Sequence, residues 1–167
     1  MSPLHIELLT SAHERGSFHS GEPALDRYLT TQATQDMRRN IAKCYVVIEK
    51  STSAITAFYT LAATGFPLEE LPPALIKTLP RYPVVPAVRI GRLAVDHRFQ
   101  GKKLGSALIA DAVLRIHDAA PAAFAIVVDA KHEKASAFYQ HHRFIPFKSQ
   151  ALTLFLPLET ALRAMRA

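Results

Sequence analysis

Residues 92–109 read RLAVDHRFQGKKLGSALI, and this stretch passes from an apolar run through a short basic turn into a second apolar pattern. The first part is typical of a strand. Apolar residues then recur every four positions from Leu104 to Ile116, with charged residues between them, which predicts an amphipathic helix over residues 104–118. The segment AFAIVVDA (123–130) is apolar almost throughout, as expected for a central strand covered on both faces. The order strand, helix, strand predicts a βαβ unit.

The turn QGKKLG (100–105) has the composition of an anion-binding site. A strand that turns directly into a helix exposes the unpaired amides of the first helical turn, and the helix dipole adds positive potential there. Gly101 lets a ligand approach the backbone, and Lys102 and Lys103 add charge. The spacing matches neither a P-loop nor a dinucleotide-binding fingerprint. An ordinary strand-to-helix turn is the alternative.

Length and composition favour one domain. The chain has 167 residues, of which 49% are apolar, so we expect residues 1–167 to bury a single core. The single cysteine, Cys44, excludes an internal disulfide framework, and the scattered histidines give no zinc-site spacing, so no metal is expected. Neither a leader peptide nor a membrane-spanning run is recognisable, which predicts a soluble cytoplasmic protein in a reducing compartment.

The charge balance points to a polyanionic partner. Twenty Lys and Arg residues against fourteen Asp and Glu give a formal net charge of +6. Such a surplus favours nucleic acid or a phosphate-rich cofactor, although a merely basic surface is equally compatible with it.

The N-terminal half reads as strands and one helical region. A short edge strand is expected at residues 6–9, and one or two helices after Pro23, broken near residue 30. KCYVVIEK (43–50) and AITAFYTLAAT (54–64) read as a hairpin. Residues 65–86 hold six of the eleven prolines and predict a long connection with a short helix around 74–79. In the strand that follows, Gly91 indicates a bulge or a close backbone approach.

The C-terminal half continues the alternation. We expect a helix over residues 133–142, strands over 144–147 and 152–156, and a terminal helix over 158–165.

RLAVDHRFQGKKLGSAL resembles the acetyl-CoA pyrophosphate loop of the GNAT N-acetyltransferase family, whose pattern is Q/R-x-x-G-x-G/A. Gln100 and Gly105 match its ends, and Lys103 stands at its inner glycine. The resemblance implies an α/β GNAT fold, with a mixed, mostly antiparallel sheet flanked by helices, that binds acetyl-CoA. The residues implied in cofactor binding are Leu93, Ala94, Val95, Gln100, Gly101, Lys102, Lys103, Leu104, Gly105, Ser106 and Phe138.

A second segment, HEKASAFYQHHRF (132–144), resembles the family's N-x-x-A-x-x-F-Y-x-x-x-G-F. His132 replaces the asparagine and Arg143 replaces the glycine. Over nearly the whole chain, SGEPALDRYL, YVVIE, AFYTLA, GRLAVD and VVDAKHEKASAFY are similar, in order and spacing, to the GNAT toxins of bacterial toxin–antitoxin pairs. That resemblance implies acetylation of the α-amine of aminoacyl-tRNA, a block of translation, a ribbon-helix-helix antitoxin and a homodimer.

The resemblance places the family's catalytic tyrosine at Tyr139. Acetyl transfer needs a proton for the departing thiolate, and a phenol of pKa about 10 is protonated at neutral pH and can donate to a thiolate whose conjugate acid lies near about 8.5. Packing of an aromatic beside Phe138 is the structural alternative. In family members a backbone amide of the strand that corresponds to Leu93–Val95 contacts the thioester oxygen.

No carboxylate in these segments stands out as a general base. An α-amine titrates near about 7.7–8.0 and lysine near about 10.4, so neutral lysine at pH 7 costs roughly 3–4 kcal/mol more. The absence of a clear base therefore favours an α-amine acceptor, while Asp129, Glu133 or a water chain stay open as bases.

Five basic residues are the candidates for contacts with tRNA phosphates. Arg38, Arg39 and Lys43 follow the first helical region, where a solvated helix end is an equal alternative, and Arg89 and Arg92 flank Gly91. Two other functions stay open. One is a GNAT enzyme that acts on protein N-termini or small amines, and the other is a non-catalytic module that binds CoA or nucleic acid.

Overall fold

The computed structural model describes residues 3–166, and its strands form a mixed sheet. Within that range seven strands pair in the order β1-β2-β3-β4-β5-β7-β6. The β1/β2, β2/β3, β5/β7 and β6/β7 pairs are antiparallel, whereas β4 and β5 are parallel. The expected α/β class with a mostly antiparallel sheet is confirmed.

The chain divides into two compact units, which are described separately. The first comprises the chain up to Ala62 together with Gly91–Ile109, and the second comprises Ala63–Ile90 and the chain from Ala110 on. Three elements run through both units: β3 (Ala54–Pro67), β4 (Val84–Val95) and α4 (Leu104–Asp118).

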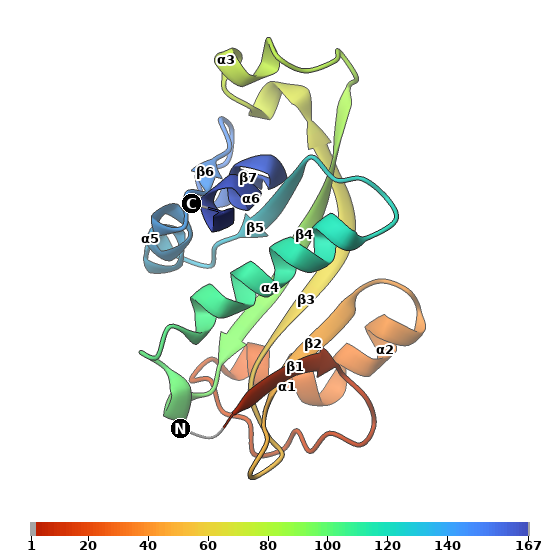
Figure 1. Cartoon of the computed structure of the whole chain (residues 1–167), viewed down its shortest axis with the longest axis vertical. Coiled ribbons are helices and arrows are strands. Elements are labelled where there is room, and N and C mark those ends of the chain that lie inside the picture. Colours follow the sequence, from red (N-terminus) through yellow and green to blue (C-terminus); the bar gives the residue numbers. More distant parts are fainter. Residues whose placement is uncertain (1–2, 167) are drawn as a thin grey trace. The chain divides into compact units, whose positions relative to one another are not determined.

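The first unit begins with an antiparallel meander. β1 (Leu4–Leu8) pairs with β2 (Lys43–Glu49), and β2 pairs with the first half of β3 (Figure 1). The hairpin predicted from KCYVVIEK and AITAFYTLAAT is therefore confirmed. Its register shifts between Val47 and Ile48, which pair with Ala57 and Ile55, so the skipped residue Thr56 marks a bulge in β3.

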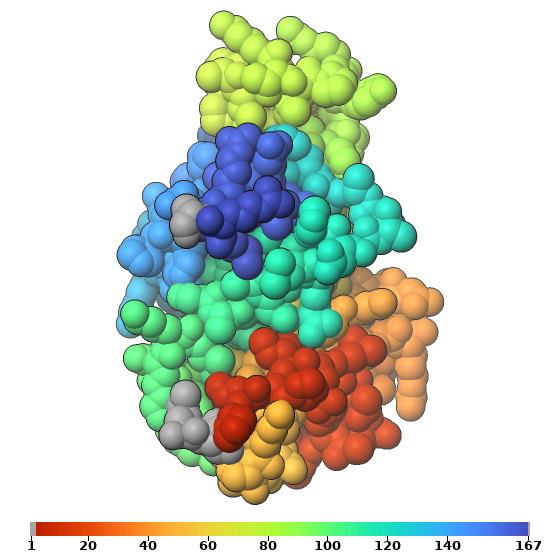
Figure 2. Space-filling model, in the orientation of Figure 1, coloured from red at the N-terminus to blue at the C-terminus, as the bar shows by residue number. Residues whose placement is uncertain are grey.

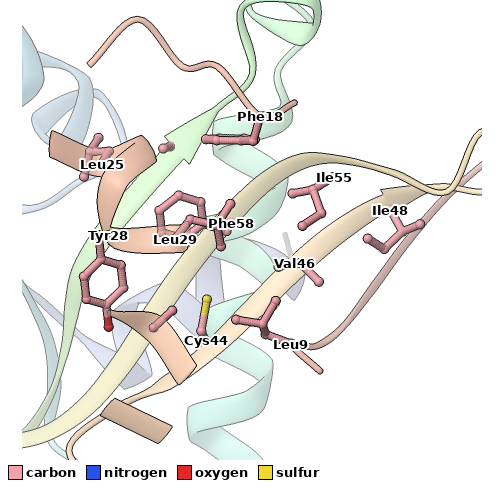
Figure 3. Close-up of a cluster of buried hydrophobic side chains, with 12 residues drawn as sticks. Leu9, Phe18, Leu25, Tyr28, Leu29, Cys44, Val46, Ile48, Ile55 and Phe58 are labelled. Atoms are coloured by element: carbon pink, nitrogen blue, oxygen red, sulfur yellow. The ribbon is translucent and has the colours of Figure 1, made fainter. Parts of the chain in front are cut away.

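Two short helices cover this part of the sheet. α1 (Pro23–Thr31) starts with proline in its first turn, and α2 (Ala33–Arg38) follows after Gln32, so of the two alternatives, one helix or two, the structure has two. Their buried residues meet those of β2 and β3 in an apolar cluster (Figure 3). The cluster comprises Leu9, Phe18, Leu25, Tyr28, Leu29, Ala33, Cys44, Val46, Ile48, Ile55, Phe58 and Ala94.

The second unit contains the parallel pair. β4 pairs with β5 (Ala125–Asp129), β5 with β7 (Thr153–Pro157), and β7 with β6 (Ile145–Pro146). α5 (Glu133–His141) follows β5, and α6 (Leu158–Arg166) contacts β5 and β7. Three phenylalanines meet in its core, with ring centroids 5.0–6.2 Å apart: Phe66, Phe147 and Phe155.

The proline-rich segment is more ordered than the sequence predicted. The connection was expected to span residues 65–86, but β3 continues to Pro67 and β4 already begins at Val84. A Cβ at Gly65 would come within 2.6 Å of Val84 Cγ1, so glycine allows the strands to approach closely. The 3-10 helix η1 (Leu68–Glu70) and α3 (Pro73–Ile76) lie between them, in the yellow-green region of Figure 2.

Other expected boundaries were wrong by a few residues. β1 begins at Leu4 rather than residue 6, and β6 has two residues instead of the four expected over 144–147. α3 ends at Ile76, short of residue 79, because the chain that follows turns towards Pro80. α4 has the predicted bounds.

Candidate active site

Asp96 anchors the turn between β4 and α4. Its side chain is fully buried, and one carboxylate oxygen accepts hydrogen bonds from the backbone amide (3.0 Å) and Nε (2.9 Å) of Arg98. The other oxygen accepts from the amide of His19 at 3.0 Å. Burial opposes ionisation of this carboxyl, but the hydrogen bonds from Arg98 and His19 outweigh it and lower its pKa. Asp96 thus joins the turn to residues 18–20 and starts the 3-10 helix η2 (His97–Phe99).

Gln100 fixes the next part of the turn through its side chain. Its Nε2 donates to the carbonyl oxygens of Ser20 (2.8 Å) and Val95 (2.9 Å). Gln100, which matches the first position of the cofactor motif, therefore shapes the loop. Its side-chain amide nitrogen is already bound to two backbone carbonyls.

The loop after Gln100 has the backbone of an anion site. Gly101 and Lys103 have left-handed dihedrals, with φ of 78° and 62°, and a Cβ on Gly101 would meet nothing within 4 Å. The amides of Leu104 and Gly105 precede the first bond of α4, which Ala107 donates to the carbonyl of Lys103 at 3.2 Å. The amide of Leu104, the exposed Lys102 and the open space above Gly101 fit a pyrophosphate.

The strand that leads into the loop makes a close side-chain contact at Gly91. The Arg92 amide donates to the Thr60 hydroxyl at 3.0 Å, and a Cβ on Gly91 would lie 3.1 Å from the same oxygen. The predicted close approach at Gly91 is therefore confirmed. Beyond it, Leu93 and Val95 are half-buried and Ala94 is buried.

Arg92 lies on an aromatic ring. Its guanidinium carbon is 3.8 Å from the centroid of Tyr28, a cation–π contact. The Tyr28 hydroxyl donates to Asp36 Oδ2 at 2.7 Å, and Gln32 Nε2 donates to Asp36 Oδ1 at 3.0 Å. The guanidinium of Arg92 thus has an aromatic partner within the first unit.

The other candidate tRNA-binding residues differ in their surroundings. Arg38, Arg39 and Lys43 are exposed at the end of α2 and the start of β2, and no hydrogen bond or ion pair engages their side chains within residues 3–166. Arg89, in the second unit, is paired with Asp129. Asp129 also accepts from the Thr153 hydroxyl at 2.9 Å, so this candidate base is already engaged by two partners.

Tyr139 occupies an aromatic setting on α5 in the second unit. The residue is 9% exposed, and its ring makes edge contacts with Phe138 and Phe144 at centroid distances of 5.2 and 5.3 Å. Across residues 3–166 its hydroxyl has no protein hydrogen-bond partner, yet no buried polar atom is left unsatisfied there, so the hydroxyl keeps access to solvent. Burial raises the pKa of Tyr139 to about 12, which keeps the phenol protonated.

The two departures from the second motif have structural roles. His132 is the N-cap of α5, where its Nδ1 accepts from the Ala135 amide at 3.1 Å, as an asparagine would. Arg143 has φ of 74°, a left-handed conformation that explains the family's glycine at this position. Its amide donates to the Gln140 carbonyl at 3.0 Å and closes the end of the helix.

Three further features concern histidine, cysteine and metal ligands. His142 is half-buried, because its ring packs 4.7 Å from that of Phe138, whereas His141 is exposed. Cys44 is buried, and burial raises the pKa of its thiol to about 12. In the described part of the chain no group of three potential metal ligands occurs, and no helix could cross a membrane.

The sequence missed the residues that hold the site. The strand pattern identifies Asp96 only as the end of the strand, although an acidic residue directly after an apolar run is a signal for a cap. Tyr28 and Asp36 fall in the region expected to be helical, and no local signal shows that Tyr28 contacts Arg92 or that Asp36 accepts a hydrogen bond from Tyr28.

Comparison with known proteins places the chain among acetyltransferases. Residues 81–152 match the model of the acetyltransferase (GNAT) domain. A tRNA-acetylating toxin of Mycobacterium tuberculosis is 34% identical over 155 residues, which cover 92% of this chain and 91% of that protein.

Solved structures agree with this match along almost the whole chain. AtaT complexed with acetyl-methionyl-tRNAfMet superposes with a TM-score of 0.90 at 30% identity and covers 99% of this chain and 100% of that chain. A mutant AtaT toxin bound to the C-terminus of the antitoxin AtaR and acetyl-CoA gives a TM-score of 0.81 at 27% identity, with 98% and 99% covered.

Proposed function

The chain belongs to the GNAT acetyltransferase family, among its tRNA-acetylating toxins, and we propose that it transfers the acetyl group of acetyl-CoA to the α-amine of aminoacyl-tRNA. The 34% identity to a tRNA-acetylating toxin over 92% of the chain carries this proposal. The loop around Gly101 and the accessible hydroxyl of Tyr139 agree with it chemically.

Acetyl-CoA fits the loop in the first unit. We assign its phosphates to the backbone and side chains of residues 100–106, and its pantetheine arm to Leu93, Ala94 and Val95, with Phe138 as an apolar contact. Asp96 and Gln100 hold the loop open through bonds to residues 19–20, so the amides need little reorganisation on binding. When bound, the thioester supplies the activated acetyl group.

Tyr139 is the proposed proton donor to the leaving thiolate. A phenol of pKa about 12 is fully protonated at neutral pH but is a weak acid. Burial raises the pKa of a thiol in the same way, as Cys44 shows within this chain, so a thiolate formed in an apolar site is a matching base. Proton transfer between partners of similar pKa is then efficient.

The acceptor amine needs no protein base at neutral pH. Asp129 is held by Arg89 and Thr153, and Glu133 is exposed in the first turn of α5. An α-amine of pKa about 7.7–8.0 is partly neutral at pH 7, whereas lysine is not. This difference favours aminoacyl-tRNA over lysine-bearing proteins and polyamines.

The tRNA is proposed to lie against Arg38, Arg39, Lys43, Arg89 and Arg92. Among these, Arg89 is the weakest candidate because Asp129 already neutralises it.

We further propose a single GNAT domain over residues 1–167, a cytoplasmic location, a homodimer, a block of translation and inhibition by a ribbon-helix-helix antitoxin. The engagement of AtaT by the antitoxin AtaR supports the last point by analogy.

A competition between acceptors tests the proposal. Purified protein and labelled acetyl-CoA are supplied with charged tRNA, deacylated tRNA, peptides with free N-termini, or polyamines. We expect a kcat/KM for charged tRNA at least 100-fold above the others. Preferential labelling of peptides or polyamines would identify the other type of GNAT enzyme, and acetyl-CoA binding without any turnover would identify a non-catalytic module.

A further inference from the structure

Arg92 is held in place while its hydrogen-bond donors stay available. The guanidinium stacks on Tyr28 at 3.8 Å, and within residues 3–166 it has no hydrogen-bond acceptor. Arg98, by contrast, is bound to Asp96, and Arg163 to Glu159. A planar guanidinium fixed on an aromatic face presents its N–H groups in one plane, which suits a phosphate oxygen pair.

Tyr28 is itself held in place through both its ring and its hydroxyl. The residue is 6% exposed, and its ring stacks on Phe58, with centroids 6.3 Å apart and planes inclined by 15°. Its hydroxyl is bonded to Asp36, which Gln32 also holds. The Tyr28 ring, on which Arg92 lies, is therefore fixed in position and orientation.

Asp36 lies near two cationic side chains, those of Arg92 and Arg39. The hydrogen bond from Gln32 lowers the pKa of Asp36, burial opposes this, and the Tyr28 hydroxyl and the charges of Arg92 and Arg39 lower it further. Asp36 is thus ionised at neutral pH and holds Tyr28, while the charge of Arg92 lies on the Tyr28 ring rather than in an ion pair with this carboxylate.

We infer that Tyr28 and Asp36 are positioning residues, which hold the Arg92 guanidinium to bind a backbone phosphate of the aminoacyl-tRNA. The inference rests on the proposed function. It separates Arg92 from Arg38, Arg39 and Lys43, whose exposed side chains can attract RNA but are not fixed in one geometry.

The test compares Tyr28→Phe, Asp36→Asn and Arg92→Gln for binding of aminoacyl-tRNA at several salt concentrations. Tyr28→Phe keeps the ring and removes the bond to Asp36. We expect Tyr28→Phe and Asp36→Asn to weaken binding about 3- to 10-fold, and Arg92→Gln to weaken it about 10-fold and lower the salt slope by about one. The KM for acetyl-CoA should stay unchanged.

Asp36→Asn is the sharpest variant, because removal of a negative charge near an RNA site strengthens binding if only net charge matters. Glu159→Gln is its matched control, since it removes an exposed carboxylate paired with Arg163 on α6 and should not weaken binding. A thermal melt of each variant verifies folding.

A double-mutant cycle of Tyr28→Phe and Arg92→Gln shows whether Tyr28 acts through Arg92. In the Arg92→Gln background, Tyr28→Phe should cause no further loss. Equal or tighter binding by Asp36→Asn, or a persistent effect of Tyr28→Phe without Arg92, would overturn the inference while leaving the proposed function intact. If wild-type protein acetylates no charged tRNA, the proposed function fails first, and this inference fails with it.

Discussion

Lys103 and Arg143 share one backbone conformation, with φ of 62° and 74°, but belong to regions that are built in opposite ways. The loop around Lys103 is exposed and held by polar side chains, namely Asp96 and Gln100. The end of α5 around Arg143 is held by backbone hydrogen bonds and by the packing of Tyr139 on Phe144. The polar side chains that hold the loop leave its backbone amides available for a ligand, whereas the packing at the end of α5 fixes the hydroxyl of Tyr139.

This difference predicts that binding and chemistry can be lost separately. Changes around Asp96 should affect the affinity for acetyl-CoA, and changes at Tyr139 should affect turnover.

Tyr139→Phe removes the proposed proton donor and keeps the aromatic packing. We expect kcat to fall roughly 10²- to 10⁴-fold, because an unprotonated thiolate is a poor leaving group. The dissociation constant of acetyl-CoA, measured by calorimetry, should change less than about twofold. A loss of affinity that equals the loss of turnover would mean that the two regions are not separable.

The pH profile of the wild-type enzyme gives an independent reading of the same residue. Because the pKa of Tyr139 is raised to about 12, kcat should not decline through this group between about pH 8 and about pH 10. An alkaline limb near about pH 10 that disappears in Tyr139→Phe would contradict the buried, protonated phenol.

Asp96→Asn tests the loop side of the comparison. The change removes the charge that Arg98 and the His19 amide bind, so we expect about 2–3 kcal/mol lower stability to unfolding and about 10-fold weaker acetyl-CoA binding. At saturating acetyl-CoA, kcat should be largely retained.

The stability lost in Asp96→Asn also has a pH dependence of known sign. The folded-state pKa of Asp96 is lowered, so its contribution is present above the unfolded pKa of about 3.9 and disappears as the pH falls through the folded value. Urea melts of wild type and variant should therefore converge in acid. A difference that grows towards low pH would contradict this assignment.

Lys103→Gly and Arg143→Gly test the conformation that the two regions share. Each removes a side chain from a left-handed position, so each should raise the free energy of unfolding by about 1 kcal/mol. Lys102→Gly is the matched control, since Lys102 is not among the residues with positive φ and should lose stability or stay neutral. Thermal melts that show no gain in either variant would contradict the account.

His132→Ala should have the smallest effect. It removes the N-cap of α5 and should cost about 0.5–1 kcal/mol, whereas His132→Asn should retain most of the stability. Chemical denaturation measures both. An equal loss in the two variants would show that the cap contributes nothing.

Sequence patterns predicted the parts of this fold that depend on local spacing. The repeat from Leu104 to Ile116 gave the bounds of α4, and the two motifs singled out Lys103 and Arg143 before their dihedrals were known. Prolines concealed the ends of β3 and β4, because Pro67 and Pro86 are compatible with extended backbone but resemble a loop in composition.

The contacts that hold the site in place join residues far apart in the sequence, and they could not be predicted. Asp96 binds the amide of His19, 77 positions away, and Arg92 stacks on Tyr28, 64 positions away by their numbers. These pairs form only when β4 and the turn after it come to lie beside α1 and the segment before it in the folded first unit. Periodicity identifies Tyr28 as a buried residue and cannot reveal the use of its hydroxyl.

The most direct test of the central claim identifies the acetylated atom. After reaction with labelled acetyl-CoA, charged tRNA is digested with nuclease, and the 3′-terminal aminoacyl-adenosine is analysed by mass spectrometry. We predict acetyl on the α-amine of the amino acid, strongly reduced with Tyr139→Phe. Label on a nucleobase, or undiminished label with Tyr139→Phe, would contradict the account.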